Sequence, residues 1–328
     1  MKVLVLNQSE VERLLLMHEC IAAMEDVFIA LARGEVEQPL RTIFRPPTVK
    51  GVMAMMPAFR GGERPLFGLK AICVFPGNAA IGKDAHQGGV MLFDGATGEL
   101  LAVANASAIT AIRTAAVSAL ATKALANEDA GDLALIGAGV QTRKHLESIA
   151  CVRKLRRVRV AASRFESAKL FADEMQPTIA VPIEPVETVQ EAIRDANLIV
   201  TATTAREPVV KREWISAGAH INAIGTFSPK AREIDSATMA AARVFTDRRE
   251  SAFNEAGDYL LAAQEGMIGP EDVTELGEVL IGSNPGRTSR NEITLFKSLG
   301  LAMEDLAATF HAYEKGRDEN IGSWIEFD

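Results

Sequence analysis

The spacing of hydrophobic residues divides the first third of the chain into two regions. Near the N-terminus, Ser9-Glu-Val-Glu12 has the form of a capping box. The apolar side chains that follow it recur at helical spacing, and Gly34 ends their run: Ile21, Met24, Val27, Phe28 and Leu31. From about Gln38 to Asn105, short β-prone runs alternate with Pro and Gly, which is typical of a mixed α+β domain with antiparallel hairpins. There we expect strands at 42–44, 69–75, 90–93 and 100–103.

An Ala-rich stretch, Ser107–Asn127, predicts a long helix that leads into a second domain. After it, apolar runs separated by helical patterns lie at 133–136, 158–162, 198–202, 220–224 and 244–246. This alternation predicts an α/β fold, with a parallel sheet covered by helices on both faces. We expect the chain after Asp247 to be helical again, and the stretch 316–328 to be too polar for a sheet.

The composition of the chain argues against nucleic-acid-binding, metal-binding and membrane proteins. The chain has 328 residues, which suggests two domains, and its net charge of −8 argues against a nucleic-acid partner. Cys20, Cys73 and Cys151 are far apart and odd in number, and the five histidines lack zinc spacing, so we expect free thiols in a reducing cytoplasm and no metal. The apolar N-terminal run is too short for a signal peptide, and no run reaches the ~18 apolar residues of a membrane span. These observations predict a cytoplasmic protein with no membrane partner.

The most specific motif is a glycine turn at the start of the second domain. The predicted strand 133–136 runs into Gly137-Ala-Gly139-Val-Gln141-Thr142, and a helical pattern follows. The first glycine allows a tight turn, and the second lets a pyrophosphate approach the N–H groups at the helix N-terminus. The third glycine of the common motif is Thr142 here. The context still favours a dinucleotide site over an ordinary strand-to-helix turn.

The end of the next predicted strand bears on the choice of cofactor. A site that prefers NAD normally has Asp or Glu there to accept the ribose 2′-hydroxyl, whereas this chain has Ser163 and Arg164. A guanidinium can hold a 2′-phosphate through charge-assisted hydrogen bonds. We therefore expect NADP to be preferred, with NAD as the other possible cofactor. The alternative is that Arg164 is a solvated residue at the start of a helix.

Cations in apolar surroundings mark the first domain. Lys70 lies within the apolar run 67–75, Arg113 lies in the Ala-rich helix, and Arg41 follows Gln38-Pro-Leu. A buried cation is unfavourable unless it meets an anion, so three that converge would hold a carboxylate. The alternative for each is a surface ion pair or a snorkelling side chain. His86, in a Gly-rich turn, is a further candidate to face the substrate, although a lone histidine is more often structural.

Together these residues carry a resemblance to a family. The blocks that support it are Gln38-Pro-Leu-Arg41-Thr, Met56-Pro-Ala, Gly68-Leu-Lys70, Thr110-Ala-Ile-Arg113-Thr-Ala-Ala, Ile136-Gly-Ala-Gly-Val-Gln141, His220-Ile-Asn-Ala-Ile-Gly225, Arg232-Glu-Ile-Asp235, Glu255-Ala-Gly-Asp258 and Thr294-Leu-Phe-Lys-Ser-Leu-Gly300. In this order they resemble the ornithine cyclodeaminase/mu-crystallin family over nearly the whole chain.

The resemblance implies a homodimer of two-domain subunits. Residues 1–118 plus 312–328 would form a substrate-binding and dimerisation domain, and residues 119–311 a Rossmann dinucleotide-binding domain with a doubly wound sheet. It implies that Arg41, Lys70 and Arg113 bind a substrate carboxylate, and that Lys70 lies beside the reacting carbon–nitrogen bond. The implied cofactor residues are Thr110, Gly137, Gly139, Val140, Gln141, Ser163, Arg164, Thr203, Ile224 and Ser298, the last three near the nicotinamide.

One position departs from the cyclodeaminases of that family. They carry an Asp two residues before the Pro of a Gly-x-x-x-Pro segment, where this chain has Phe227. A benzyl group neither binds an ammonium by charge nor accepts a proton, which disfavours ornithine cyclodeamination. The chain is more similar to the branch that reduces cyclic ketimines such as Δ1-pyrroline-2-carboxylate.

The expected activity is therefore NAD(P)H-dependent reduction of a small imino acid. Arg41 and Arg113 would fix the carboxylate, and Phe227 would form an apolar wall. Lys70, or a water that it holds, would supply the proton, with the pKa of Lys70 lowered by like-charge repulsion from the two arginines. An alanine-type amino-acid dehydrogenase, a reductase of an open-chain imine such as iminosuccinate, and a non-catalytic, crystallin-like NADPH-binding protein stay open.

Overall fold

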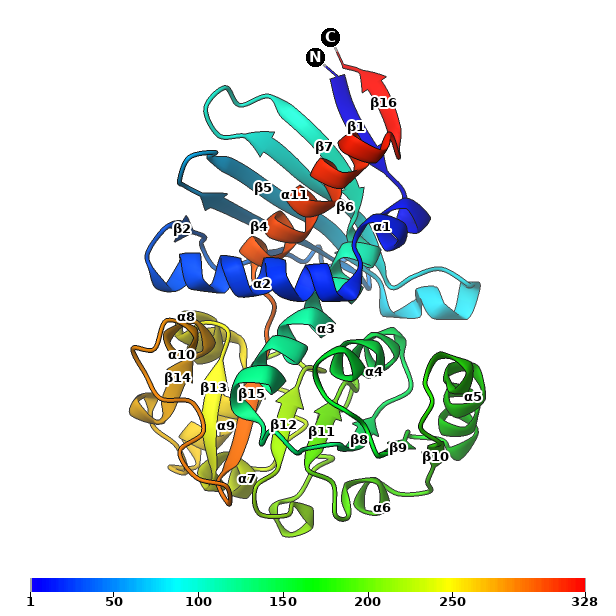
Figure 1. The fold of residues 1–328 in the computed structure, drawn as a ribbon, viewed down its shortest axis with the longest axis vertical. Coiled ribbons are helices and arrows are strands. Elements are labelled where there is room, and N and C mark those ends of the chain that lie inside the picture. The colour runs from blue at the N-terminus through cyan, green and yellow to red at the C-terminus, as the bar shows by residue number, and fades with distance from the viewer. Residues whose placement is uncertain (1, 328) are drawn as a thin grey trace. The chain divides into compact units, whose positions relative to one another are not determined.

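The computed structural model describes residues 2–327, which divide into two compact units (Figure 1). The first unit holds the chain up to Thr114 and from Gly300 onward, and the second unit is Ala115–Leu299. The expected boundaries lie at residues 118 and 312. The units instead divide at 114 and 300, because the whole of helix α11 (Ala302–Glu319) packs on the sheet of the first unit.

The first unit is built on one mixed sheet with the strand order β16-β1-β7-β6-β5-β4-β2, and β3 pairs with β4. Its remaining elements are β1 (Lys2–Leu6), α1 (Gln8–Leu14), α2 (Met17–Ala32), β2 (Val36–Glu37), β3 (Thr42–Phe44), β4 (Val52–Arg60), β5 (Leu66–Val74), β6 (His86–Asp94), β7 (Leu100–Asn105), the start of α3 (Ala106–Leu125) and β16 (Ser323–Glu326). Strands β4 to β7 form antiparallel hairpins, as predicted.

Two expectations for the ends of the chain are wrong. The stretch 316–328 was expected to lie outside any sheet, yet β16 pairs antiparallel with β1, with Trp324 opposite Leu4. Trp324 and Ile325 have side chains that favour strands, and pairing with β1 outweighs the polarity of the residues around them. The first helix is capped by Asn7 rather than by Ser9: the Asn7 side chain accepts the N–H of Glu10, and the Glu10 carboxylate accepts the N–H of Asn7.

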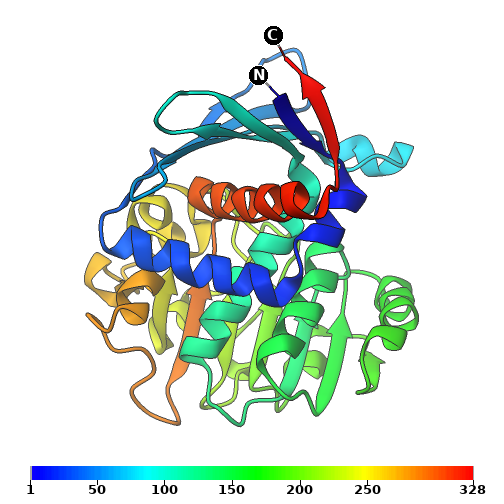
Figure 2. The same cartoon turned by 45° about the horizontal axis from the view of Figure 1, so that its top comes forward.

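One face of this sheet is covered by α11, and α2 packs beside α11, as Figure 2 shows. Alternate residues of β5 point to that covered face, among them Leu66, Gly68 and Lys70. The opposite face is apolar as well, because alternation along the strands places Met53, Phe67 and their neighbours there. Phe67 is 48% exposed, and its ring packs in a tilted arrangement against that of Phe59, with the ring centroids 4.7 Å apart. This face, on the side of the sheet away from α11, is the uncovered apolar face of the first unit.

The second unit is built on an all-parallel sheet with the order β10-β9-β8-β11-β12-β15-β13-β14. Its elements are β8 (Asp132–Ile136), α4 (Val140–Val152), β9 (Arg157–Ala161), α5 (Phe165–Met175), β10 (Ile183–Pro185), α6 (Val189–Ile193), β11 (Leu198–Thr201), β12 (His220–Ala223), α7 (Ser236–Ala241), β13 (Ala242–Thr246), α8 (Arg249–Glu255), α9 (Gly257–Gln264), β14 (Val273–Glu275), α10 (Leu276–Leu280) and β15 (Ile293–Lys297).

Helices cover both faces of this sheet, so the doubly wound Rossmann-type prediction is confirmed. Leu133 and Leu135 of β8 join a core with α4 and α5, whereas Ala134 and Ile136 join a second core on the other face. The expectation that the chain is wholly helical after Asp247 is wrong, because β14 and β15 follow. Strand β15 inserts between β12 and β13. Its buried apolar run is too short for periodicity to separate strand from helix.

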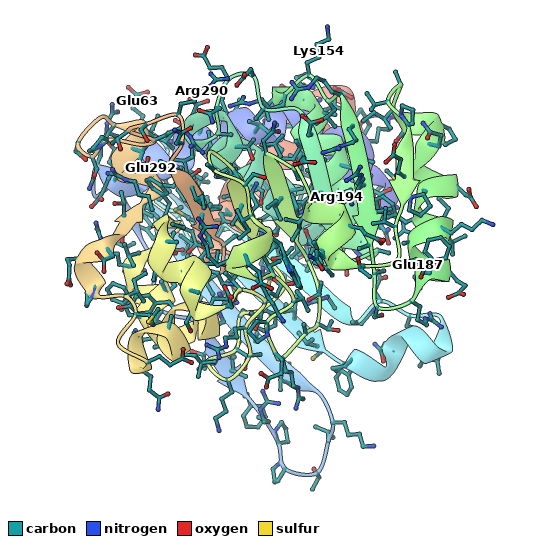
Figure 3. The ribbon with its side chains drawn as sticks, turned by 90° about the horizontal axis from the view of Figure 1, so that it is seen from below. Glu63, Lys154, Glu187, Arg194, Arg290 and Glu292 are labelled. Atoms are coloured by element: carbon teal, nitrogen blue, oxygen red, sulfur yellow. The ribbon has the colours of Figure 1, made fainter. Side chains whose placement is uncertain are left out.

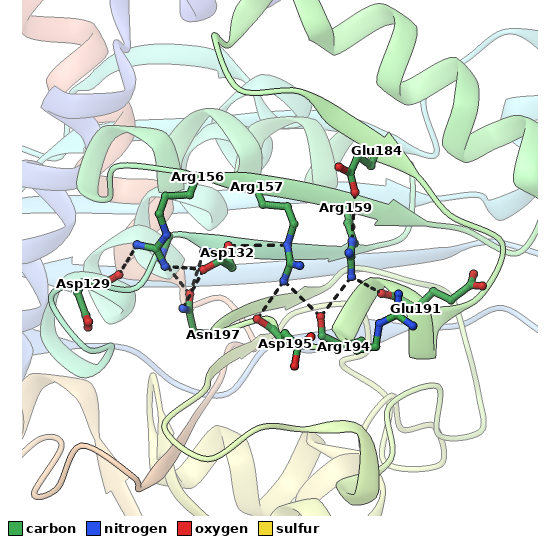
Figure 4. A network of polar contacts seen from close by, with 11 residues as sticks. Asp129, Asp132, Arg156, Arg157, Arg159, Glu184, Glu191, Arg194, Asp195 and Asn197 are labelled. Atoms are coloured by element: carbon green, nitrogen blue, oxygen red, sulfur yellow. Dashed lines mark hydrogen bonds and ion pairs between the residues drawn. The ribbon is translucent and has the colours of Figure 1, made fainter.

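Arginines tie the early strands of this sheet together (Figure 4). Asp132 pairs with Arg156, while Arg157 donates to the carbonyl of Asp195 at 3.0 Å. Arg159 donates to the carbonyl of Glu191 at 3.0 Å and pairs with Glu184. These bonds anchor the region around α6 to β8 and β9.

Some charges of the second unit lie on its surface. Lys154, Glu187, Arg194 and Arg290 are exposed and are labelled in Figure 3. By contrast, α3 is long and apolar enough to cross a membrane, but 83% of its most apolar window is buried inside the protein. That burial is typical of a core helix.

Candidate functional site

Two buried cations of the first unit share one carboxylate. Lys70 lies on β5 and Arg113 on α3, and they are only 2% and 4% exposed. Asp305, in the first turn of α11, lies with one carboxylate oxygen 2.7 Å from Lys70 Nζ and the other 3.0 Å from Arg113 Nε. Glu304 accepts a hydrogen bond from Arg113 Nη1 at 2.6 Å. The interior thus holds a compact cluster of alternating charges, which is the arrangement that buried ions require.

Two glycines allow α11 to come this close. A side chain at Gly68, two residues before Lys70, would meet Leu306 Cβ at 2.9 Å. Gly300 adopts φ 76°, and a Cβ there would lie 2.6 Å from Arg113 Nη1. A glycine inside a strand commonly marks such a close approach.

The segment that contains Arg41 fixes the start of α11. Buried Gln38 accepts the N–H of Met303 at 3.0 Å through its side-chain oxygen. Arg41 Nη2 donates to the carbonyl of Gly300 at 3.0 Å. Arg41 therefore lies next to the glycine against which Arg113 packs, so the three predicted cations gather in one region of the first unit.

The pKa of the Lys70 amine is lowered from its ordinary value to about 8. Burial is the largest cause, and Arg113 and Arg41 add to the effect, while Asp305 opposes it. The predicted direction is right, but the predicted cause, like-charge repulsion, is the smaller one. The charges of Asp305 and Glu304 outweigh burial and raise the pKa of Arg113. The charges of Arg113 and Lys70 likewise outweigh burial and lower the pKa of the Asp305 carboxyl.

Two other predicted residues lie near Lys70. Thr110 Oγ1 is 3.5 Å from Lys70 Nζ. His86 begins β6 on the same face of the sheet as Lys70, and its carbonyl accepts a hydrogen bond from Ser107 Oγ. Burial, then the charges of Lys70 and Arg113, lower the pKa of the His86 imidazole. A neutral His86 near the cations can accept or donate a hydrogen bond.

The glycine turn of the second unit has the features that a dinucleotide needs. Gly137 adopts φ 113°, and a side chain there would meet the carbonyl of Ala202 at 2.6 Å. A side chain at Gly139 would meet nothing within 4 Å, and no side chain caps the N-terminus of α4 there. Val140 is exposed, and the buried side-chain oxygen of Gln141 has no hydrogen-bond partner within residues 2–327. Open space beside uncapped N–H groups suits a pyrophosphate.

Thr142 explains the departure from the third glycine. Its side chain is fully buried, and its hydroxyl oxygen would lie 3.3 Å from a Cβ at Gly137. It therefore fills the helix–strand contact that the third glycine commonly makes. At the end of β9, Ser163 and Arg164 are exposed, and Arg164 is the N-cap residue of α5.

Glu233, which the sequence analysis assigned no role, organises the loops after β11 and β12. Its side chain accepts hydrogen bonds from Thr203 N and Oγ1, both at 2.7 Å, from Gly225 N at 2.6 Å and from Thr201 Oγ1 at 2.9 Å. Burial raises the pKa of the Glu233 carboxyl, and Lys297 opposes this. Thr203, a predicted cofactor residue, is thus held directly by Glu233. Ile224, another predicted cofactor residue, donates its backbone N–H to the carbonyl of Thr201.

A second buried ion pair extends this arrangement to β15. Asp258, in the first turn of α9, accepts the N–H groups of Glu233 and Ile234 and lies 2.9 Å from Lys297 Nζ. Lys297 also donates to the carbonyl of Thr226 at 2.7 Å. Predicted residue Ser298 follows directly and is buried, with its N–H bonded to Ala223. One network therefore fixes the carboxyl ends of β11, β12 and β15, which is the edge where ligands bind in open α/β sheets.

Charged partners in both clusters are the functional candidates that sequence reasoning missed. Glu304 and Asp305 lie beyond Gly300, outside the segments that carry the family resemblance. Glu233, Asp258 and Lys297 lie inside those segments, but no role was expected of them. The available signal was a charge next to apolar residues, as at Lys297 in Ile293–Leu299. Phe227, by contrast, lies on the loop after β12 and is 45% exposed.

Comparison with known proteins identifies the family of this chain. The family model described as "Ornithine cyclodeaminase/mu-crystallin family" matches residues 1–320. The chain belongs to this family. Among curated relatives, a Δ1-pyrroline-2-carboxylate reductase of Bacillus cereus is 36% identical over 326 residues, which are 99% of this chain and 100% of that protein.

Solved structures in the family resemble this chain over its full length. The Δ1-pyrroline-2-carboxylate reductase of Thermococcus litoralis, in complex with NADH and L-proline, has a TM-score of 0.94 and 37% identity, covering 98% of this chain and 99% of that one. An archaeal alanine dehydrogenase dimer with bound NAD has a TM-score of 0.93 and 35% identity, with full coverage of both chains.

The buried pair of Lys297 and Asp258 generates a stability prediction. Lys297→Met removes one partner and leaves a buried carboxylate, so we expect the free energy of unfolding to fall by about 3–5 kcal/mol. Urea denaturation measures this. The control is Arg290→Met, which breaks the exposed pair with Asp129 and should cost at most about 1 kcal/mol. Equal losses in the two variants would contradict the role of the buried pair.

Proposed function

We propose that this family member is an NAD(P)H-dependent reductase of small imino acids, with cyclic ketimines such as Δ1-pyrroline-2-carboxylate as the preferred class. The observation that carries this is that three cations gather in one region of the first unit. Lys70 and Arg113 are buried on the shared carboxylate of Asp305, and Arg41 donates to the carbonyl of Gly300, the glycine against which Arg113 packs. Cations that converge in this way suit a substrate with a carboxylate.

Each side chain of the cluster has a distinct task in this proposal. Arg113 uses Nε and Nη1 for the two acids, and Nη2 takes part in neither bond, which suits it to a substrate carboxylate. Arg41 provides the second donor. Fixing the carboxylate also fixes which face of the imine carbon is presented, and orientation of this kind can lower a barrier by ~7–11 kcal/mol. When bound, the reduced dinucleotide supplies the hydride.

Lys70 is the proton donor in this mechanism. An imine accepts hydride far better once its nitrogen is protonated. With a pKa of about 8, the amine is mostly charged at neutral pH yet gives up its proton readily, as an efficient general acid should. The same residues would equally hold an open-chain 2-imino acid. Amino-acid dehydrogenation of the alanine type, for which the structural relative is named, and iminosuccinate reduction are therefore the second candidates.

Two other activities are less well supported. Phe227 lacks the charge that a distal amine would need, which disfavours ornithine cyclodeamination. Retention of all three cations disfavours a non-catalytic, crystallin-like role. The test is oxidation of NADPH and NADH, followed by absorbance, with Δ1-pyrroline-2-carboxylate, Δ1-piperideine-2-carboxylate, iminosuccinate, and pyruvate plus ammonia. Turnover that is highest with the two cyclic imines supports the proposal, and cofactor binding without any turnover contradicts it.

The subunit is proposed to act as a homodimer in the cytoplasm. The uncovered apolar face of the first unit's sheet, with Met53 40% and Phe67 48% exposed, supports a partner surface. The related alanine dehydrogenase is described as a dimer. The three cysteines are free thiols, in keeping with a reducing compartment.

Lys70→Met tests the proton donor. We expect kcat with the preferred imine to fall about 10²–10⁴-fold, because the positioned acid is lost, while dinucleotide binding stays unchanged. Steady-state kinetics and fluorescence titration with NADPH measure the two effects. The matched control is Lys154→Met, which removes an exposed lysine of the second unit. Near-normal turnover of the Lys70 variant would exclude the role.

Arg164→Ser tests the cofactor preference. If Arg164 holds the 2′-phosphate, its removal should raise the KM for NADPH about 10–100-fold, the equivalent of a charged hydrogen bond, and change the KM for NADH little. Arg194→Ser, another exposed arginine of the same unit, is the control. Equal effects on the two cofactors would remove Arg164 from the 2′-phosphate site.

Phe67→Asp tests the partner surface. A charge in the middle of the apolar face should convert the dimer to a monomer, as measured by analytical ultracentrifugation. Leu170→Asp places the same charge on an exposed apolar residue of α5 and should leave the dimer intact. A wild-type protein that sediments as a monomer would contradict the proposal.

A further inference from the structure

We propose that Asp305 is a positioning residue of the reaction, because its single carboxylate holds the proton donor Lys70 and the carboxylate clamp Arg113 at the same time. This inference rests on the proposed function. It gives Asp305 a role in the reaction, and it states how Lys70 and Arg113 are held in a fixed position relative to each other.

The geometry joins three elements through one side chain. Lys70 comes from β5, Arg113 from α3 and Asp305 from the first turn of α11. Each carboxylate oxygen has a different partner, with Oδ2 at 2.7 Å from Lys70 Nζ and Oδ1 at 3.0 Å from Arg113 Nε. The Asp305 side chain is 1% exposed. A lysine side chain has four rotatable bonds, so a buried ionic contact is an effective way to hold its amine in one place.

The charge of Asp305 also keeps Lys70 protonated. The charged groups around the amine are Asp305 and Glu304 on α11, Arg113 on α3 and Arg41 before β3, and His86 on β6 is a neutral titratable neighbour. Burial, Arg113 and Arg41 all lower the pKa of Lys70, and Asp305 raises it. Cys20 on α2 does not add a charge, because burial raises the pKa of its thiol. Without Asp305 the Lys70 amine would lose its proton at lower pH.

Glu304 provides the matched control because it touches the clamp but not the donor. Its carboxylate accepts from Arg113 Nη1 at 2.6 Å and from the N–H of Leu301 at 3.0 Å. Loss of its charge should weaken the hold on Arg113 while the contact between Asp305 and Lys70 persists. Substitutions at the two adjacent acids therefore distinguish the hold on Lys70 from the hold on Arg113.

The experiment compares Asp305→Asn and Glu304→Gln with the wild type in the pH dependence of kcat. Because Lys70 must be protonated to act, we expect wild-type kcat to decline above about pH 8. In Asp305→Asn the decline should begin at least one pH unit lower, with a loss of at least about 3-fold at pH 7.5 from the smaller protonated fraction and partial recovery at pH 6. Glu304→Gln should raise the KM for the imino acid and leave the pH dependence of kcat in place.

Asp305→Glu keeps the charge but moves it by one methylene group, which tests the inference even if the Asn variant does not fold. We expect it to keep the wild-type pH profile and to lose about 10-fold in kcat, because the amine is displaced. A loss in Asp305→Asn that is equal at every pH, or a Glu variant with wild-type kcat, would overturn the positioning role. If the wild type turns over imino acids and the variants give either of these results, only the positioning role of Asp305 is overturned. If the wild type turns over no imino acid, the proposed function is overturned as well.

Discussion

The contact of one buried carboxylate with two buried cations is the constraint on which the first unit depends. Lys70 and Arg113 could not be buried alone, since desolvating an unpaired charge costs several kcal/mol. Asp305 can reach both only because α11 begins close to β5 and α3. The glycines at 68 and 300, and the bonds from Gln38 and Arg41 to the start of the helix, all serve that approach. Residues far apart in the chain thus act together as one electrostatic unit.

In the second unit, buried carboxylates bind the backbone groups of loops as well as a buried cation. Loops at the carboxyl ends of parallel strands carry exposed backbone groups that have no regular partner. The Glu233 carboxylate accepts hydrogen bonds from backbone N–H groups of the loops after β11 and β12. The Asp258 carboxylate accepts the backbone N–H of Glu233 and pairs with Lys297. Buried ion pairs add little net stability compared with an apolar core, but they allow few alternative arrangements. They are suited to holding an edge where a ligand must be met in a fixed geometry.

Much of the fold and part of the site follow from the sequence, and the failures have physical causes. The glycine turn, the parallel sheet and the out-of-place cations at 70 and 113 depend on local pattern, which sequence displays. Strands β15 and β16 were missed because their pairing partners lie more than forty residues away or at the other end of the chain. Glu304 and Asp305 were missed because acids in a first helical turn usually serve the helix dipole, and only the folded contact with Lys70 gives them another task.

The most direct measurement of the central claim is a crystal structure of the protein with L-proline and oxidised dinucleotide bound. The account predicts that the proline carboxylate lies within about 3 Å of the guanidinium groups of Arg41 and Arg113. The amine of Lys70, still in contact with Asp305, should lie beside the ring nitrogen. A proline carboxylate bound by other residues, with the cluster of Lys70, Arg113 and Asp305 left away from it, would contradict the account.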